Sequence, residues 1–141
     1  MIYLKCNLRK DLKRHEGLFL KPYVDSTGHL TIGYGTNITR GITQEEAEML
    51  LDMRLNAAIQ AAKQFSWWTE INSVRKDVVA NMIYSLGIDG FKTFRKMITA
   101  LEKKDYELAS GEMLDSLWKQ QVGYRALELA QLMREGRRPS I

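Results

Sequence analysis

One apolar stripe near the start of the chain repeats every four residues and consists of Leu4, Leu8 and Leu12. Residues at this spacing share one face of a helix. Asn7 is a suitable N-cap and Gly17 a suitable stop, so the pattern predicts a helix over residues 7–16. The next position on the leucine stripe is Glu16, which places a carboxylate at the end of an apolar face.

The period changes from helical to alternating after Gly17, and this change predicts a β-hairpin. The pattern predicts a short strand over residues 21–24 and a returning strand over residues 29–34. The turn between them, residues 25–28 (Asp-Ser-Thr-Gly), has Asp first and Gly fourth, which is typical of a type I turn. We expect this hairpin to bring Asp25 and Thr31 close together.

A capping box opens the next predicted helix, because Thr43 is followed three residues later by Glu46. The apolar residues that follow at helical spacing are Ala47, Leu50, Leu51, Leu55, Ala58, Ile59 and Ala62. This helix would run for about six turns, which is long enough to link two lobes.

Four further helices are predicted by apolar stripes over residues 74–86, 94–101, 106–117 and 127–133. Gly87 ends the first of them and Gly136 ends the last. Trp67 and Trp68 precede these helices. We expect the two tryptophans to anchor a core rather than to form a sugar-stacking platform.

Composition narrows the class of protein. With 141 residues, of which 45% are hydrophobic, the chain has the size and apolar content of one soluble domain. Cys6 is the only cysteine, so an intramolecular disulfide is excluded. Only His15 and His29 could join it as metal ligands of the usual kind, which excludes a structural zinc site with four Cys or His ligands. We expect Cys6 to be at least half-buried and both histidines to lie on the surface.

Charge and hydropathy bear on location and partners. The longest uncharged run, residues 78–88, is about half the length of a membrane helix, so we expect no stable membrane insertion. The first residues lack the apolar region of a signal peptide, which predicts a soluble chain made in the cytoplasm. The formal net charge of +4 and the pI of about 9.2 indicate an anionic partner. Nucleic acid, anionic lipid and bacterial cell wall all fit that charge.

Two carboxylates have contrasting predicted environments. Glu16 lies on an apolar stripe at a helix C-terminus, and both burial and the helix dipole would raise its pKa. Asp25 lies at a solvated turn and would be ionised. A protonated carboxyl facing an ionised one is the arrangement that glycoside hydrolysis uses. Glu16 would then protonate the leaving oxygen, and Asp25 would activate water with Thr31 as a hydroxyl partner for that water.

Three segments carry a family resemblance: residues 15–17 (His-Glu-Gly), 22–25 (Pro-Tyr-Val-Asp) and 30–35 (Leu-Thr-Ile-Gly-Tyr-Gly). They resemble the signature of the phage-type lysozymes, the endolysins of glycoside hydrolase family 24. The family pattern has Glu, then Asp nine positions later, then Thr six positions further on. Glu16, Asp25 and Thr31 match it. Weaker similarity continues over residues 41–47, 74–75, 81–87, 90–91, 118 and 123–126.

The resemblance implies an α+β fold: a mostly helical, lysozyme-like single domain in two lobes. A small lobe with the β-hairpin and the linking helix would cover about residues 13–65. A helical lobe would cover about residues 66–141 together with the N-terminal helix. The active-site cleft would lie between the lobes.

The resemblance also implies an activity. It predicts cleavage of the β-1,4 bond between N-acetylmuramic acid and N-acetylglucosamine in bacterial peptidoglycan, with inversion, so that Asp25 is a base for water rather than a nucleophile. It places Arg125 against Glu16, where the arginine would lower the pKa of Glu16 and oppose burial. Tyr84 and Ser85 match positions that contact the glycan. The muramidase would need no metal or cofactor, and the resemblance suggests that it leaves the host cytoplasm through a holin-type pore. A monomer is the default expectation, because the sequence does not reveal the oligomeric state.

Other interpretations stay open at this point. A zinc amidase would need Cys6 and the two histidines, whose spacing is unlike that of known zinc motifs. A lytic transglycosylase would use Glu16 but needs no water-activating Asp25. A basic nucleic-acid-binding module fits the pI, although the basic residues are spread over several elements rather than forming one stripe. A surface Glu and a turn-forming Asp would explain the two carboxylates without any chemistry.

Overall fold

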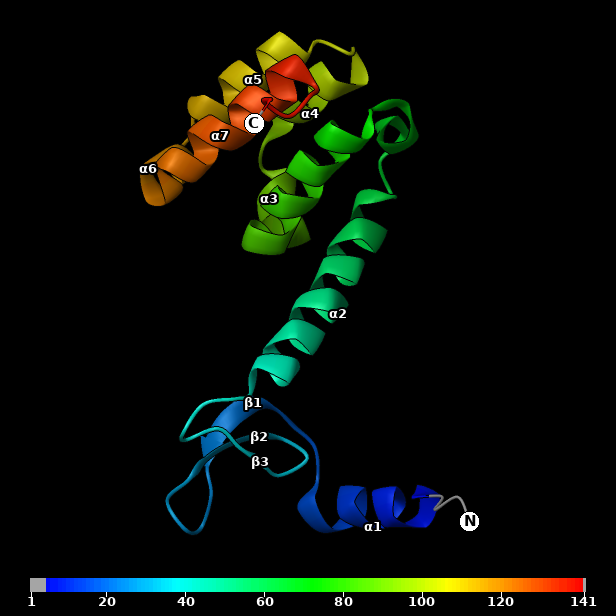
Figure 1. Ribbon diagram of the computed structural model, residues 1–141, viewed down its shortest axis with the longest axis vertical. Coiled ribbons are helices and arrows are strands. Elements are labelled where there is room, and N and C mark those ends of the chain that lie inside the picture. The colour runs from blue at the N-terminus through cyan, green and yellow to red at the C-terminus, as the bar shows by residue number, and fades with distance from the viewer. Residues whose placement is uncertain (1–4, 141) are drawn as a thin grey trace. The chain divides into compact units, whose positions relative to one another are not determined.

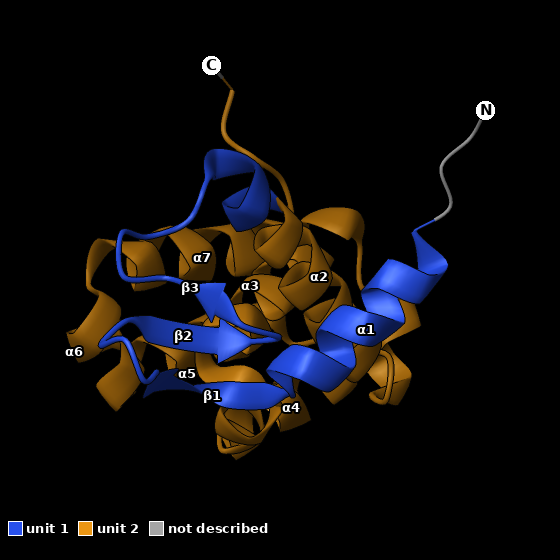
Figure 2. Ribbon diagram, turned by 90° about the horizontal axis from the view of Figure 1, so that it is seen from below, with its two compact units in different colours: residues 1–48 blue, residues 49–141 orange. Residues whose placement is uncertain are grey.

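Figure 1 shows the computed structural model of the protein, which describes residues 5–140. The chain divides into two compact units, one ending at Glu48 and one beginning at Met49 (Figure 2). Helix α2 (Gln44–Ala62) begins in the first unit and continues in the second. Among the described residues, no helix combines the length and the apolar character needed to cross a bilayer.

Within residues 5–48, the first unit contains helix α1, a three-stranded antiparallel sheet in the order β1-β2-β3 and the start of α2. Its elements are α1 (Cys6–Glu16), β1 (Phe19–Val24), β2 (Leu30–Gly33) and β3 (Thr36–Asn37). β1 and β2 pair Tyr23 with Thr31 and Val24 with Leu30, which confirms the predicted hairpin. β3 extends the sheet on the other side of β2, with Thr31 opposite Asn37.

Helix α1 begins one residue earlier than predicted. The amide of Arg9 donates to the carbonyl of Lys5 at 2.9 Å, so Lys5 is the N-cap. Asn7 therefore lies inside the helix, and its predicted role as the cap is wrong. The helix ends as predicted before Gly17, whose φ of 71° lies in the left-handed region that glycine adopts without steric cost.

Helix α1 buries none of its residues. Leu8 and Leu12 of the leucine stripe are 47% and 46% exposed. Leu4, the first member of the stripe, lies outside the described residues. Cys6 is exposed at the start of the helix, so the prediction that it fills an apolar site is wrong.

The capping box of α2 forms as predicted. The amide of Thr43 donates to Oε1 of Glu46 at 2.9 Å, and the amide of Glu46 donates to the Thr43 hydroxyl at 3.1 Å. The Thr43 amide lowers the pKa of Glu46, and the Thr43 hydroxyl lowers it further. The helix has 19 residues, about five turns rather than six. Only Ala58 and Ala62, near its C-terminal end, are buried.

The second unit contains the rest of α2, a short 3-10 helix and five α-helices. These are η1 (Ser66–Glu70), α3 (Ser73–Lys92), α4 (Arg95–Glu102), α5 (Tyr106–Leu114), α6 (Leu117–Val122) and α7 (Tyr124–Glu135). α7 packs against α3, α5 and α6. Trp67 is 1% exposed and its ring stacks on Phe65 with centroids 4.9 Å apart, while Trp68 is 7% exposed. The predicted role of the two tryptophans as core anchors is confirmed.

Two helix boundaries in this unit test the predicted helix ends. Gly87 has φ of 76° and breaks α3 as predicted, although the chain resumes a helix at once and continues to Lys92. The single helix predicted over residues 106–117 is wrong, because α5 and α6 are separate. Ser116 separates them: its hydroxyl donates to the Met113 carbonyl at 2.7 Å and accepts the amide of Lys119, so it caps the second helix.

Candidate active site

The predicted site residues fall into two groups. Glu16, Asp25 and Thr31 belong to the first unit, and Tyr84, Ser85 and Arg125 belong to the second. Among the described residues, no group of three or more His, Cys, Asp or Glu side chains is arranged to hold a metal ion.

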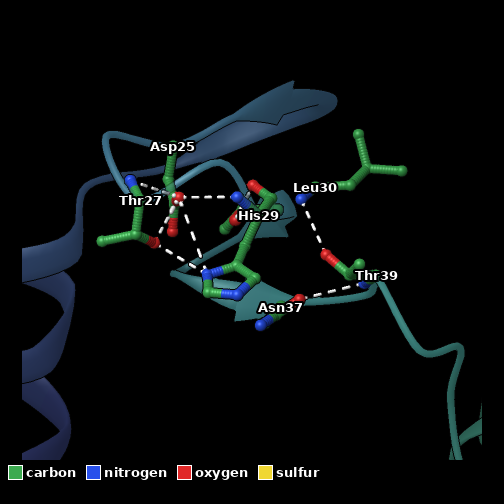
Figure 3. Close-up of polar contacts among 7 residues, drawn as sticks. Asp25, Thr27, His29, Leu30, Asn37 and Thr39 are labelled. Carbon is green, nitrogen blue, oxygen red and sulfur yellow. Dashed lines mark hydrogen bonds and ion pairs between the residues drawn. The ribbon is translucent and has the colours of Figure 1, made fainter.

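Asp25 follows β1 directly and opens the turn that leads to β2. Its Oδ1 accepts three hydrogen bonds: the amides of Thr27 and His29 each donate at 2.9 Å, and the Thr27 hydroxyl donates at 2.7 Å (Figure 3). The Gly28 amide closes the turn on the Asp25 carbonyl at 3.0 Å. The local sequence Asp-Ser-Thr-Gly-His therefore builds a hydrogen-bonded frame around one carboxylate oxygen.

This frame sets the charge of Asp25. The His29 amide lowers the pKa of Asp25 below its ordinary value of 3.8, and the Thr27 hydroxyl lowers it further, while partial burial acts in the opposite direction. Asp25 is therefore ionised at neutral pH, as predicted. None of the hydrogen bonds formed by residues 5–140 reaches Oδ2 of Asp25. With the side chain 32% exposed, one oxygen is held and the other is open to a water molecule.

Thr31 lies on β2 and is 3% exposed. Its hydroxyl donates to the carbonyl of His29 at 3.0 Å, and the same carbonyl accepts the amide of Asp25 at 2.9 Å. The hairpin thus brings Asp25 and Thr31 together through one shared acceptor, and the expected proximity is confirmed. The hydroxyl proton of Thr31 is engaged with the backbone, which leaves its oxygen lone pairs for an incoming donor.

Glu16 is the last residue of α1, and its carboxylate lies against the backbone of Gly35. A Cβ built on Gly35 would lie 2.6 Å from Cδ of Glu16 and would overlap its Oε2. Glu16 itself is exposed. The predicted burial of this carboxylate is therefore wrong, because the leucine stripe that was expected to cover it is itself half exposed.

Arg125 and Tyr84 line one groove of about 370 Å³ in the second unit, together with apolar side chains of α2. Oδ1 of Asn81 accepts hydrogen bonds from Nε of Arg125, at 3.1 Å, and from its Nη2. Tyr84 is 42% exposed. Ser85 is also exposed, but it is not among the residues that line this groove.

Sequence reasoning missed four residues that shape these sites: Thr27, His29, Gly35 and Asn81. His29 is exposed, as predicted, but its Nδ1 also lies 2.7 Å from the Thr27 hydroxyl and 4.0 Å from Oδ1 of Asp25. A turn with Asp followed by Thr and His at alternate positions was a usable signal, since such side chains bond local backbone groups. The Asn81–Arg125 contact joins residues 44 apart and left no local signal.

A comparison with known proteins identifies the family. The family model described as phage lysozyme matches residues 13–138. This chain belongs to the phage lysozyme family. The match confirms the resemblance proposed from the Glu, Asp and Thr spacing, and together with the small antiparallel sheet and the many helices it confirms the α+β lysozyme-like fold.

Individual relatives support the same assignment. The chain is 30% identical to the pre-baseplate central spike protein Gp5 of Enterobacteria phage T4 over 89% of its own length, but it spans only 27% of that protein. It is 24% identical to the probable T4-type lysozyme 1 of Dictyostelium discoideum, covering 92% of this chain and 95% of the relative. It is 32% identical to an endolysin of Acyrthosiphon pisum secondary endosymbiont phage 1, covering 73% of this chain and 72% of the relative. Membership of the phage lysozyme family supports a glycosidase-type enzyme that acts on peptidoglycan.

Proposed function

We propose that this phage lysozyme family member is a muramidase. It hydrolyses the β-1,4 bond between N-acetylmuramic acid and N-acetylglucosamine in bacterial peptidoglycan. Glu16 is the general acid that protonates the leaving oxygen, and Asp25 is the general base that activates the attacking water. The observation that carries the proposal is the state of Asp25: an ionised carboxylate with Oδ1 held by three donors and Oδ2 free.

The chemistry follows from that arrangement. A general base must be ionised and must present a lone pair to the water that it deprotonates. Asp25 meets both requirements, and Thr31 can accept a second hydrogen bond from the same water. Attack by this water on the face opposite the leaving group inverts the anomeric centre. No covalent link to Asp25 is then needed.

The second unit supplies the proposed glycan contacts. Tyr84 and Ser85 are exposed residues with hydroxyl groups, and Arg125 has a guanidinium whose remaining N–H groups can donate to sugar oxygens. Pairing of Arg125 with Glu16 remains a prediction drawn from the family. Release through a holin-type pore is also a prediction drawn from the family. Monomeric action and synthesis in the host cytoplasm are predictions drawn from the sequence alone.

The first test is clearing of a purified peptidoglycan suspension by the wild type and by the Glu16→Gln and Asp25→Asn variants. Asp11→Asn and Glu45→Gln are matched controls, since they make the same chemical changes at exposed carboxylates elsewhere in the first unit. We expect the wild type and both controls to clear the suspension and each site variant to lose at least about a hundredfold in rate. Circular dichroism checks that every variant is folded.

The products distinguish the mechanisms. Inverting hydrolysis gives a new reducing end that is first the α-anomer, which NMR detects before mutarotation. An anhydro-muramic acid product, or an Asp25→Asn variant as active as the wild type, would indicate a lytic transglycosylase instead of a muramidase. A folded wild type that clears nothing would refute the proposed function.

A further inference from the structure

We propose that Thr27 and His29 are positioning residues for Asp25, joined in a hydrogen-bonded relay that fixes Oδ1 and turns Oδ2 toward the attacking water. In this relay Nδ1–H of His29 donates to the Thr27 hydroxyl, and that hydroxyl donates to Oδ1 of Asp25. The inference rests on the proposed role of Asp25 as the base. It adds two side chains that the Glu, Asp and Thr pattern of the family does not include.

The direction of the relay follows from counting protons. The Thr27 oxygen lies 2.7 Å from Oδ1 of Asp25 and 2.7 Å from Nδ1 of His29 (Figure 3). A hydroxyl has a single proton. If that proton pointed to Nδ1, two oxygen acceptors would face each other at 2.7 Å with no proton between them. The proton therefore goes to Asp25, and Nδ1 of His29 must carry a proton of its own.

The relay constrains the carboxylate in a way that the backbone alone does not. The amides of Thr27 and His29 already donate to Oδ1, and the hydroxyl adds a third donor with a different direction. Three convergent donors leave the carboxylate little freedom to rotate about its χ2 angle, because any rotation breaks at least one charge-assisted bond. Precise placement of a base raises kcat rather than substrate affinity, since the base acts in the transition state.

His29 has a second effect, through its side chain. Its Nδ1 lies 4.0 Å from Oδ1 of Asp25, and its ring is half exposed, so a positive charge on the ring would further favour the ionised carboxylate. The neutral Nδ1–H form preserves the relay, because the donated proton is on the nitrogen that faces Thr27. The geometry therefore requires one tautomer of His29 rather than one charge state.

The kinetic test uses two pairs of matched variants. Thr27→Val removes the hydroxyl but keeps the side-chain shape and the amide, whereas Thr27→Ser keeps the hydroxyl. His29→Asn can keep an N–H donor near the place of Nδ1, whereas His29→Gln carries its amide further out. We expect Thr27→Val and His29→Gln to lower kcat about threefold to tenfold with KM nearly unchanged. Thr27→Ser and His29→Asn should stay close to the wild type.

The pH profile separates positioning from a merely structural role. Loss of the hydroxyl in Thr27→Val should move the acidic limb of the kcat profile to higher pH, since the ionised form of Asp25 loses a donor. At a pH at which the His29 ring is neutral, the double variant Thr27→Val with His29→Gln should be no slower than Thr27→Val alone, because the two side chains then act in series. A drop in stability or a rise in KM with the acidic limb unmoved would overturn the proposal.

A spectroscopic readout keeps the relay distinguishable from the proposed function. The chain has only two histidines, so long-range ¹H–¹⁵N spectra of the imidazole rings have to distinguish His29 only from His15. We expect neutral His29 to carry its proton on Nδ1 in the wild type, and the NMR titration of the Asp25 carboxyl to move to higher pH in Thr27→Val. If the wild type clears no peptidoglycan, the proposed function fails and these spectra still decide the relay. A proton on Nε2 alone would refute the relay even in an active enzyme.

Discussion

The carboxylate of Glu16 occupies the space that a side chain on Gly35 would fill. The nearest approach of a Cβ on Gly35 would be to Oε2 of Glu16, with Cδ at 2.6 Å. Gly35 also has φ of 72°, a conformation that disfavours every residue with a Cβ. A glycine at this position therefore serves two purposes: it lets the chain turn between β2 and β3, and it leaves room for the proposed acid.

Replacing Gly35 by alanine should displace Glu16. We expect Gly35→Ala to lower the clearing rate by about tenfold to a hundredfold, because a shift of about 1 Å in a catalytic group is enough to do so. The positive φ alone should cost about 1–2 kcal/mol in the free energy of unfolding. Clearing assays and urea unfolding measure the two effects separately.

Gly33→Ala is the matched control for this experiment. Gly33 has nearly the same φ, 70°, but a Cβ there would meet nothing within 4 Å. It should lose a similar amount of stability and keep its activity. If both variants lose activity in equal measure, backbone strain rather than contact with Glu16 explains the defect.

Local signals in the sequence predicted those features that depend on local bonds. The capping box at Thr43 and the turn at Asp25 formed as predicted, because their hydrogen bonds join residues within four positions of each other. The break between α5 and α6 was missed although the bonds of Ser116 are also local. The apolar stripe ran on past Ser116, and nothing in its period showed that the Ser116 side chain would cap a new helix.

The site was harder to predict than the fold because it depends on packing. The stripe of Leu8 and Leu12 predicted which residues share a face, but a stripe does not say whether another element covers it. Glu16 is consequently exposed where burial was expected. The family resemblance found Arg125, but its contact with Asn81 depends on α3 and α7 lying together. The relay through Thr27 and His29 depends on side-chain rotamers, which periodicity does not specify.

The capping box makes the stability of the protein depend on pH. The Thr43 amide and hydroxyl lower the pKa of Glu46 from its ordinary 4.5 in the folded state. The stabilisation from this carboxylate is therefore complete well above pH 4.5 and is lost as the pH falls through the lower, folded-state pKa. We expect Glu46→Gln, which can still complete a capping box, to be less stable than the wild type at neutral pH. That difference should shrink below pH 4.5.

Urea unfolding at several pH values measures this dependence. Glu45→Gln is the control, because it removes a carboxylate from the same first turn without altering the capping box. A difference between wild type and Glu46→Gln that stays constant down to about pH 3 would show that the Glu46 charge contributes nothing specific to folding.

Arg75 closes the C-terminal end of α7 from its place on α3. Its Nε donates to the Met133 carbonyl at 2.7 Å, its Nη2 donates to the Arg134 carbonyl at 3.0 Å, and the guanidinium carbon lies 3.7 Å from the centre of the Tyr106 ring. Lysine cannot reproduce this planar fork and stack. We expect Arg75→Lys to lower the free energy of unfolding by about 1–2 kcal/mol in urea titrations.

Arg138→Lys is the comparison for Arg75→Lys. Arg138 bonds Asp77 at 2.8 Å, but both side chains are more than half exposed, so the change should cost under about 0.5 kcal/mol. Equal losses in the two variants would mean that the carbonyl contacts of Arg75 contribute no more than an ordinary surface ion pair.

Asn81 on α3 holds the guanidinium of Arg125 on α7. One amide oxygen accepts from two guanidinium N–H groups in a partly buried setting, so it orients the arginine toward the groove that Tyr84 also lines. Asn81→Leu keeps the approximate volume and removes the acceptor, and it should cost about 1–3 kcal/mol in unfolding free energy. If Arg125 contacts glycan, the same variant should raise KM for peptidoglycan more than it lowers kcat. Asn81→Asp retains the acceptor and should preserve stability. The ¹⁵Nε–H NMR signal of Arg125 should show that its hydrogen bond persists in this variant. Should Asn81→Leu change stability but leave both kinetic constants intact, Arg125 would be a structural residue of the second unit and would leave the proposed glycan site.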